Sequence, residues 1–128
     1  MPFLLDTCAF LWLNDRKKIS PRAQETIEGH SDDLFVSAIS AFEIGIKTVK
    51  KKLNLSLPPE EWFRQMIAFF GVNYVPFNYQ IASQTAMLPP LHADPCDRFL
   101  IATAREYNMQ ILTPDRLISQ YPEAKCLW

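Results

Sequence analysis

Hydrophobic and polar positions along the chain form two kinds of pattern. Short runs rich in Leu, Ile, Val or Phe are typical of buried strands, whereas apolar residues that recur every three to four positions indicate helices. The short runs predict strands at Phe3–Leu5, Leu34–Val36, Asn73–Val75, Met109–Thr113 and Lys125–Trp128.

The stretches between these runs have helical spacing, as in Ile39, Phe42 and Ile46. Proline pairs and glycines mark their ends. Helices are predicted over residues 7–13, 20–29, 37–53, 58–70, 79–88, 94–108 and 114–120. Short strands separated by helices predict a single α/β domain over residues 1–128, with a mostly parallel sheet of four or five strands between helical layers.

Composition, net charge and cysteine content limit the classes of function that this chain can have. The chain has 128 residues, of which 48% are hydrophobic and 21% charged, as in an ordinary globular domain. A formal net charge of −1 gives no overall attraction to nucleic acid, so an anionic substrate needs local cations or metal ions. The three widely spaced cysteines favour a reducing cytoplasm over a disulfide scaffold or a zinc site. No apolar run reaches membrane-spanning length, so we expect a soluble cytoplasmic protein.

Carboxylates stand at the predicted strand ends and at one helix start. The carboxyl ends of parallel strands meet at one edge of a sheet, where ligands bind. The acids expected at this edge are Asp6, Glu43, Asp97 with Asp94, and Asp115.

Each of these acids also has a purely structural interpretation. Asp6 and Asp94 can cap the helices that follow them. Ser40 and Glu43 have capping-box spacing, and Glu43 can also pair with Lys47 one turn later. Thr113, Pro114 and Asp115 read as N-cap, N1 and N2 of the last helix.

The acids are harder to explain as a group. Several carboxylates at one edge repel one another unless cations join them. Ligand sets made only of oxygen suit Mg²⁺ or Mn²⁺ better than zinc. A pair of such ions about 4 Å apart activates water and stabilises the leaving oxygen in phosphodiester cleavage. The pattern is therefore consistent with a metal-dependent nuclease.

Four segments carry these acids in order along the chain. They are Leu4-Leu5-Asp6-Thr7; Val36-Ser37-Ala38-Ile39-Ser40, continuing to Glu43 and Lys47; His92 with Asp94-Pro95, Asp97-Arg98 and Leu100-Ile101-Ala102; and Leu112-Thr113 with Asp115. Together they resemble a PIN-domain ribonuclease and, more narrowly, a VapC-type toxin of a bacterial toxin–antitoxin pair. The resemblance implies a PIN-like α/β/α sandwich and Mg²⁺- or Mn²⁺-dependent endonucleolytic cleavage of RNA, often tRNA or ribosomal RNA, that leaves a 5′-phosphate.

The resemblance also implies residue roles and partners. It makes Asp6, Glu43, Asp97 and Asp115 the catalytic and metal-site acids, with Thr7, Ser40, Asp94 and Thr113 orienting ligands or waters around them. It implies a cognate antitoxin, a homodimer and a toxin–antitoxin hetero-oligomer. The sequence departs from the family pattern at Cys8, Ala93 and Cys96, which affects RNA selectivity more than catalysis because no acid is lost.

Basic and aromatic residues leave alternatives open. Lys47, Arg98 and Arg116 are candidates for contacts with RNA phosphates or a partner, whereas Lys50–Lys52 fits either RNA contact or a solvated helix end. His92 suits a packing or hydrogen-bonding role better than that of a base. The aromatic residues expected mostly in the core, with a minority free to form a groove for a partner, are Trp12, Trp62, Phe63, Phe69 and Phe70.

Two other functions fit parts of the pattern. A catalytically silent PIN-like module would bind RNA or protein without cleaving it. A phosphatase with Asp6 as nucleophile needs a second aspartate two residues on, where this chain has Cys8. The complete set of acids favours the nuclease over both.

Overall fold

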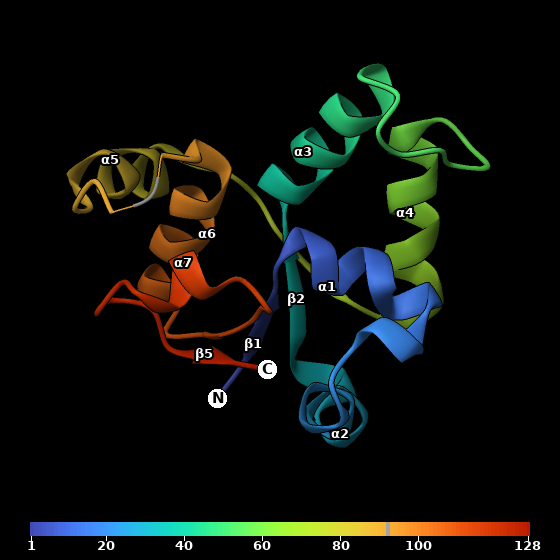
Figure 1. Ribbon diagram of the computed structural model, residues 1–128, viewed down its shortest axis with the longest axis horizontal. Helices are drawn as coiled ribbons and strands as arrows, with labels where there is room; N and C mark the ends of the chain where they lie inside the picture. Colours follow the sequence, from blue (N-terminus) through green and yellow to red (C-terminus); the bar gives the residue numbers. More distant parts are fainter. Residues whose placement is uncertain (92) are drawn as a thin grey trace.

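A parallel β-sheet forms the centre of the computed structural model, which describes residues 1–91 and 93–128. Its strands are β1 (Phe3–Leu5), β2 (Leu34–Ser37), β3 (Asn73–Val75), β4 (Gln110–Leu112) and β5 (Cys126–Leu127). They lie in the order β3-β2-β1-β4-β5, and every neighbouring pair is parallel (Figure 1). The predicted α/β class with a mostly parallel sheet is confirmed.

Helices connect the strands and cover both faces of the sheet. They are α1 (Thr7–Leu11), α2 (Pro21–Gly29), α3 (Ala38–Val49), α4 (Pro59–Phe70), α5 (Tyr79–Met87), α6 (Pro95–Glu106) and α7 (Arg116–Ser119), with 3₁₀ turns at Trp12–Asn14, Arg16–Lys18 and Ser31–Asp33. Figure 1 shows α5, α6 and α7 on one side of β1 and β2, with α1, α3 and α4 on the other. No helix in residues 1–91 or 93–128 is long and apolar enough to cross a membrane.

Two apolar clusters hold these layers together. Side chains alternate between the faces of a strand, so neighbouring residues of β1 belong to different clusters. Leu5 packs in one cluster with Phe10 of α1, whereas Leu4 packs in the other with Ile101 of α6. The three central strands β2, β1 and β4 are largely buried on both faces, as parallel strands between helical layers must be, whereas the edge strand β3 exposes Asn73 and Tyr74. This arrangement is the predicted α/β/α sandwich.

The register of the sheet aligns the strand ends that matter for function. Leu5 pairs with Val36 of β2 on one side and with Leu112 of β4 on the other. The next residue of each strand therefore lies at the same edge. The Asp6 backbone N–H donates to Leu112 O over 3.1 Å, so β1 and β4 remain joined where the site begins.

Helix α3 is shorter than predicted, ending at Val49 instead of near Leu53. The chain turns at Lys51, which has a left-handed backbone with φ of 59°. After this turn, the N–H groups of Lys52 and Leu53 both donate to Lys47 O. Leu53 then packs against the core from a loop, which explains why its helical spacing was misleading.

Helix α4 starts one residue later than predicted, ends where predicted, and divides its aromatic residues between the core and the surface. Phe63 and Met66 are buried at the spacing of one helical face, whereas Phe69 lies off that face and is 80% exposed. Phe69 is therefore one of the minority of aromatic residues expected outside the core. Gly71 ends the helix with φ of 64°, a conformation that favours glycine.

Candidate active site

Asp6 lies at the floor of the candidate site, immediately after β1. Its Oδ1 accepts a hydrogen bond from Ala9 N over 2.7 Å, which caps α1 as predicted. Its Oδ2 accepts a hydrogen bond from Thr113 Oγ1 over 2.5 Å. Each carboxylate oxygen has two lone pairs, so both oxygens keep capacity for a further ligand. The backbone N–H of Ala9 was not singled out from the sequence, although the spacing of an N-cap and its N3 residue signals it.

The electrostatic surroundings of Asp6 disfavour its negative charge. Burial raises the pKa of Asp6 from its ordinary value of 3.8 to about 6, and the charges of Glu43 and Asp115 raise it further, against the lowering effect of the Thr113 and Ala9 hydrogen bonds. Only 4% of the residue is exposed to solvent. A cation beside Asp6 would therefore favour its ionised form.

Glu43 faces Asp6 from the second turn of α3. Thr7 Oγ1 lies 2.7 Å from Glu43 Oε1 and 2.9 Å from Ser40 Oγ. A hydroxyl has one hydrogen and an ionised carboxylate only accepts, so Thr7 donates to Glu43 and accepts from Ser40. The predicted ion pair with Lys47 is present, with Lys47 Nζ 3.8 Å from Glu43 Oε2.

The predicted capping box of Ser40 and Glu43 is wrong. Ser37 is the N-cap of α3, because its backbone is extended and its side chain accepts from Ile39 N. Ser40 is fully buried inside the helix, where its hydroxyl meets Thr7 of α1. These hydroxyls therefore join two helices at the site instead of closing a helix end.

Helix α6 carries the second pair of acids. Asp94 caps the helix as predicted, accepting from Cys96 N over 2.9 Å. Asp97 lies half-buried in the first turn. Arg98 Nη2 donates to the carbonyl oxygens of Thr85 and Leu88 over 3.2 and 2.8 Å, so this guanidinium nitrogen ties α6 to the end of α5. His92 lies outside the described residues.

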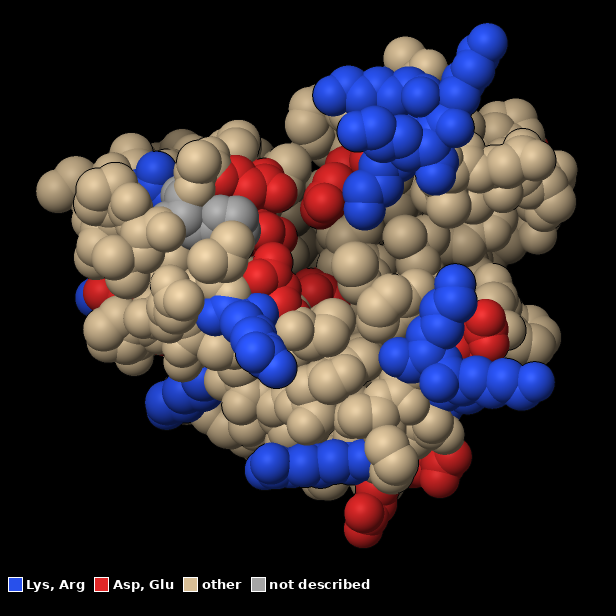
Figure 2. Space-filling view, in the orientation of Figure 1, with Lys and Arg blue, Asp and Glu red and all other residues tan. Residues whose placement is uncertain are grey.

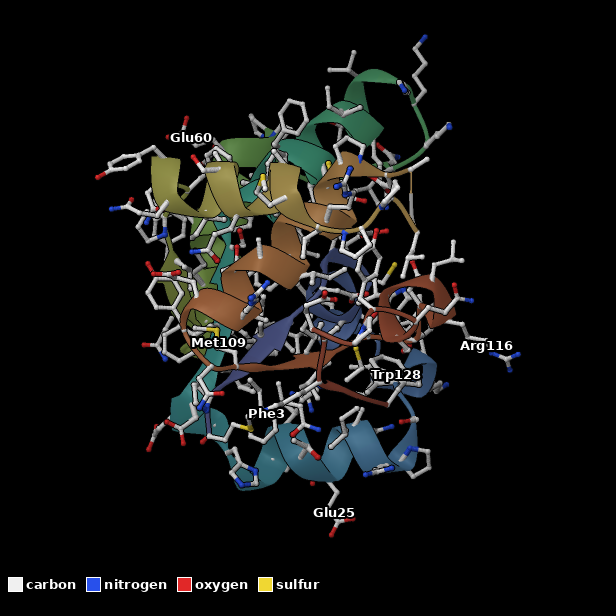
Figure 3. The ribbon with its side chains drawn as sticks, turned by 90° about the vertical axis from the view of Figure 1, so that its left-hand side faces the viewer. Phe3, Glu25, Glu60, Met109, Arg116 and Trp128 are labelled. Carbon is white, nitrogen blue, oxygen red and sulfur yellow. The ribbon has the colours of Figure 1, made fainter. Side chains whose placement is uncertain are left out.

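Asp115 approaches the floor from the end of β4. It is the N-cap of α7 and accepts from Leu117 N over 2.8 Å, so the prediction of Thr113 as the N-cap was wrong. Thr113 still belongs to the sheet edge, because its N–H donates to Leu127 O. Its hydroxyl accepts from Asp115 N while donating to Asp6. Arg116 is exposed, and in Figure 3 its side chain points outward from α7.

The four predicted acids share one neighbourhood. Glu43 and Asp115 both act on the pKa of Asp6, and Asp97 acts with Glu43 on the pKa of Cys8. In Figure 2 acidic side chains gather around a hollow in the surface, with basic side chains at its rim. The hollow is therefore negative inside and positive around the edge.

These residues fit a hard divalent ion held in an open site. No group of three or more His, Cys, Asp or Glu side chains in the described parts of the chain is placed to hold a metal ion by itself. Mg²⁺ does not need one, because it keeps several waters and binds through one or two carboxylates and substrate phosphates. Burial raises the pKa of both Cys8 and Cys96 to about 11, so both thiols are protonated at neutral pH in the metal-free protein.

Fold and site together define a PIN domain, and comparison with known proteins agrees. The PIN domain family model matches residues 3–124. The chain is 31% identical to Ribonuclease VapC22 of Mycobacterium tuberculosis over an alignment of 129 residues, which covers 98% of this chain and 97% of the relative. The chain therefore belongs to the PIN-domain family and, within it, to the VapC-type ribonucleases.

Solved structures confirm the fold. The VapBC complex of Salmonella typhimurium bound to DNA matches with a TM-score of 0.71 at 17% identity, covering 99% of this chain and 97% of that one. VapBC2 of Rickettsia felis bound to a promoter fragment gives 0.72 at 13% identity, with 99% and 98% covered. FitAcB of Neisseria gonorrhoeae gives 0.70 at 17% identity, with 98% and 96% covered.

Proposed function

We propose that this protein is a metal-dependent endoribonuclease that acts as the toxin of a toxin–antitoxin pair. The observation that carries the proposal is the state of Asp6, which is buried, held by two hydrogen bonds and surrounded by further carboxylates. A buried carboxylate with a raised pKa beside other acids is a common sign of a functional site.

The acids have distinct roles in this proposal. Asp6 and Asp97 would hold Mg²⁺ or Mn²⁺ directly, and Glu43 and Asp115 would act directly or through water. A bound ion of this kind supplies a nucleophilic water and stabilises charge on the leaving oxygen of a phosphodiester.

The surrounding residues position these acids. Thr113 and the Ala9 N–H fix the direction of the Asp6 oxygens, and Thr7 fixes one oxygen of Glu43. Lys47 offsets the charge of Glu43. Such supporting hydrogen bonds orient metal ligands and maintain their basicity.

The proposed substrate is structured RNA, either tRNA or ribosomal RNA, cleaved to leave a 5′-phosphate. Lys47 and the exposed Arg116 are the proposed phosphate contacts, and Arg98 adds to them through the part of its guanidinium not bound to α5. The proposed activity on RNA and the free cysteines support a cytoplasmic location.

The proposed protein partner is a cognate antitoxin, which inhibits cleavage. Two of the similar solved structures are named as VapBC proteins on DNA, and this chain has their fold over almost its whole length. We propose that this chain likewise forms a homodimer and a hetero-oligomer with its antitoxin.

The test is cleavage of a pool of tRNA and ribosomal RNA by the purified protein, free of antitoxin, in Mg²⁺, Mn²⁺ or EDTA. We expect discrete fragments that need the metal and disappear with Asp6→Asn. Asp33→Asn, which removes an exposed carboxylate just before the amino end of β2 and therefore at the opposite end of the sheet from the acids, is the matched control. Cleavage that survives in Asp6→Asn or in EDTA contradicts the proposal. No cleavage and no Mg²⁺ binding by calorimetry would favour a silent module.

A further inference from the structure

The turn after α3 carries three consecutive lysines, Lys50, Lys51 and Lys52, here named the lysine turn. All three are exposed. Their backbone is fixed, because the Lys50 N–H donates to Ile46 O and the Lys52 N–H donates to Lys47 O on either side of the left-handed Lys51. The three ammonium groups therefore project from a defined turn.

The lysine turn lies at the rim of the acidic hollow. Figure 2 shows basic side chains gathered over the end of α3, next to the acidic side chains of the hollow. Lys47 joins the two regions, since it pairs with Glu43 one turn before the lysine turn begins. Positive charge is thus continuous from the candidate site to the end of α3.

Position on the helix sets the distance between the lysine turn and the site. Lys50 is seven residues after Glu43, which corresponds to roughly 10 Å along an α-helix. A strand whose scissile phosphate lies near Glu43 would therefore reach the lysine turn within a few nucleotides.

Charge balance gives a reason for such a contact. A hollow lined with carboxylates repels a polyanion, and the net charge of −1 supplies no compensating long-range attraction. Lysines that neutralise phosphates beside the hollow provide affinity through counterion release, without reading sequence.

We propose that the lysine turn is a phosphate-binding exosite that holds RNA within a few nucleotides of the cleavage point. This inference rests on the proposed ribonuclease function. It assigns substrate affinity to residues outside the catalytic acids. In the competing interpretation the lysines only stabilise the C-terminal end of α3 through the helix dipole, which affects folding and not RNA.

The first test is RNA binding in EDTA, where metal-dependent cleavage is blocked. The variant Lys50→Gln/Lys51→Gln/Lys52→Gln is compared with Lys17→Gln/Lys18→Gln/Arg64→Gln, which removes the same charge from exposed residues elsewhere. With a labelled RNA of about twenty nucleotides, we expect roughly tenfold weaker binding for the first variant only. The slope of log affinity against log salt should fall by about 2, because each phosphate contact on a single strand contributes about 0.7.

The second test is cleavage kinetics on an RNA that the wild-type protein cuts. Loss of the exosite should raise KM with little change in kcat, because the lysines do not touch the reacting phosphate. Equal losses in both variants, an unchanged salt slope or no RNA binding by the wild type would overturn the exosite. Selective loss of binding by a protein that cleaves no RNA would retain the exosite and refute the proposed nuclease.

Discussion

Two parts of the site hold their carboxylates in different ways. The floor holds Asp6, which is 4% exposed and bound by Thr113 and the Ala9 N–H. The wall holds Glu43 on α3, whose side chain is 19% exposed and lies 3.8 Å from Lys47. Burial disfavours the negative charge of Asp6, whereas water and Lys47 stabilise the negative charge of Glu43. Asp6 therefore needs a nearby cation to stay ionised, whereas Glu43 already has Lys47 beside it.

The largest expected effect is on catalysis, where loss of the floor carboxylate Asp6 should cost more activity than loss of the wall carboxylate Glu43. Asp6→Asn keeps the shape of the floor but removes its charge, and we expect RNA cleavage to fall by roughly 10³-fold, the upper range for a preorganised electrostatic group. Glu43→Gln should cost roughly 10- to 100-fold, as for groups that support a metal site. Single-turnover cleavage at saturating Mg²⁺ measures both. Equal losses of cleavage rate in the two variants would contradict this difference between floor and wall.

The next effect is the pH dependence of stability in the metal-free protein. A pKa raised from 3.8 to about 6 means that folded Asp6 binds a proton more tightly than unfolded Asp6. Stability therefore falls as pH rises from about 4 to about 6, by up to about 3 kcal/mol, and stays at the lower level above that window.

Asp6→Asn should remove this contribution. We expect it to be more stable than wild type at pH 7.5 and equal to it near pH 3.5, as measured by urea unfolding in EDTA. Asp33→Asn serves as the exposed control. A wild type whose stability relative to Asp6→Asn does not change with pH would refute the burial cost, and added Mg²⁺ should narrow the difference at pH 7.5.

A smaller contrast concerns the two threonines. Thr113→Val removes the hydrogen bond that lowers the pKa of Asp6, so the acid limb of the pH–rate profile should move to higher pH. Thr7→Val frees Glu43 Oε1 and should leave that limb in place. We expect each to reduce activity about tenfold, the lower range for such supporting bonds. The same shift in both variants would argue against separate roles.

The smallest expected effect lies at the wall. Lys47→Met removes an ion pair whose lysine side chain is 34% exposed, and such pairs contribute about 0.5 kcal/mol or less to folding. Thermal unfolding in low and high salt measures it. A loss of several kcal/mol would show that Glu43, like Asp6, is shielded from water and depends on a cation for its charge.

Sequence patterns predicted the fold well because one physical rule governs it. Parallel strands buried on both faces appear as short apolar runs, and all five runs became strands. The helix caps at Asp6 and Asp94 could also be predicted, because each side chain bonds to a backbone N–H only two or three residues further along the chain.

The errors arose where tertiary contacts decide. Ser40 has capping-box spacing, yet its partner is Thr7 on another helix. The bond between Thr113 and Asp6 joins residues 107 positions apart, a distance at which local spacing carries no information. The grouping of the acids could be predicted from topology, but the distances between them could not.

The position of β1 also determines when the site can form during synthesis. Asp6 is made before its neighbour β4 and before its hydrogen-bond donor Thr113, which lies 107 positions later in the chain. Domains begin to fold while the chain is still emerging, yet this floor stays incomplete until β4 has been made and has docked. A nascent or truncated chain without β4 therefore lacks the bond that orients Asp6.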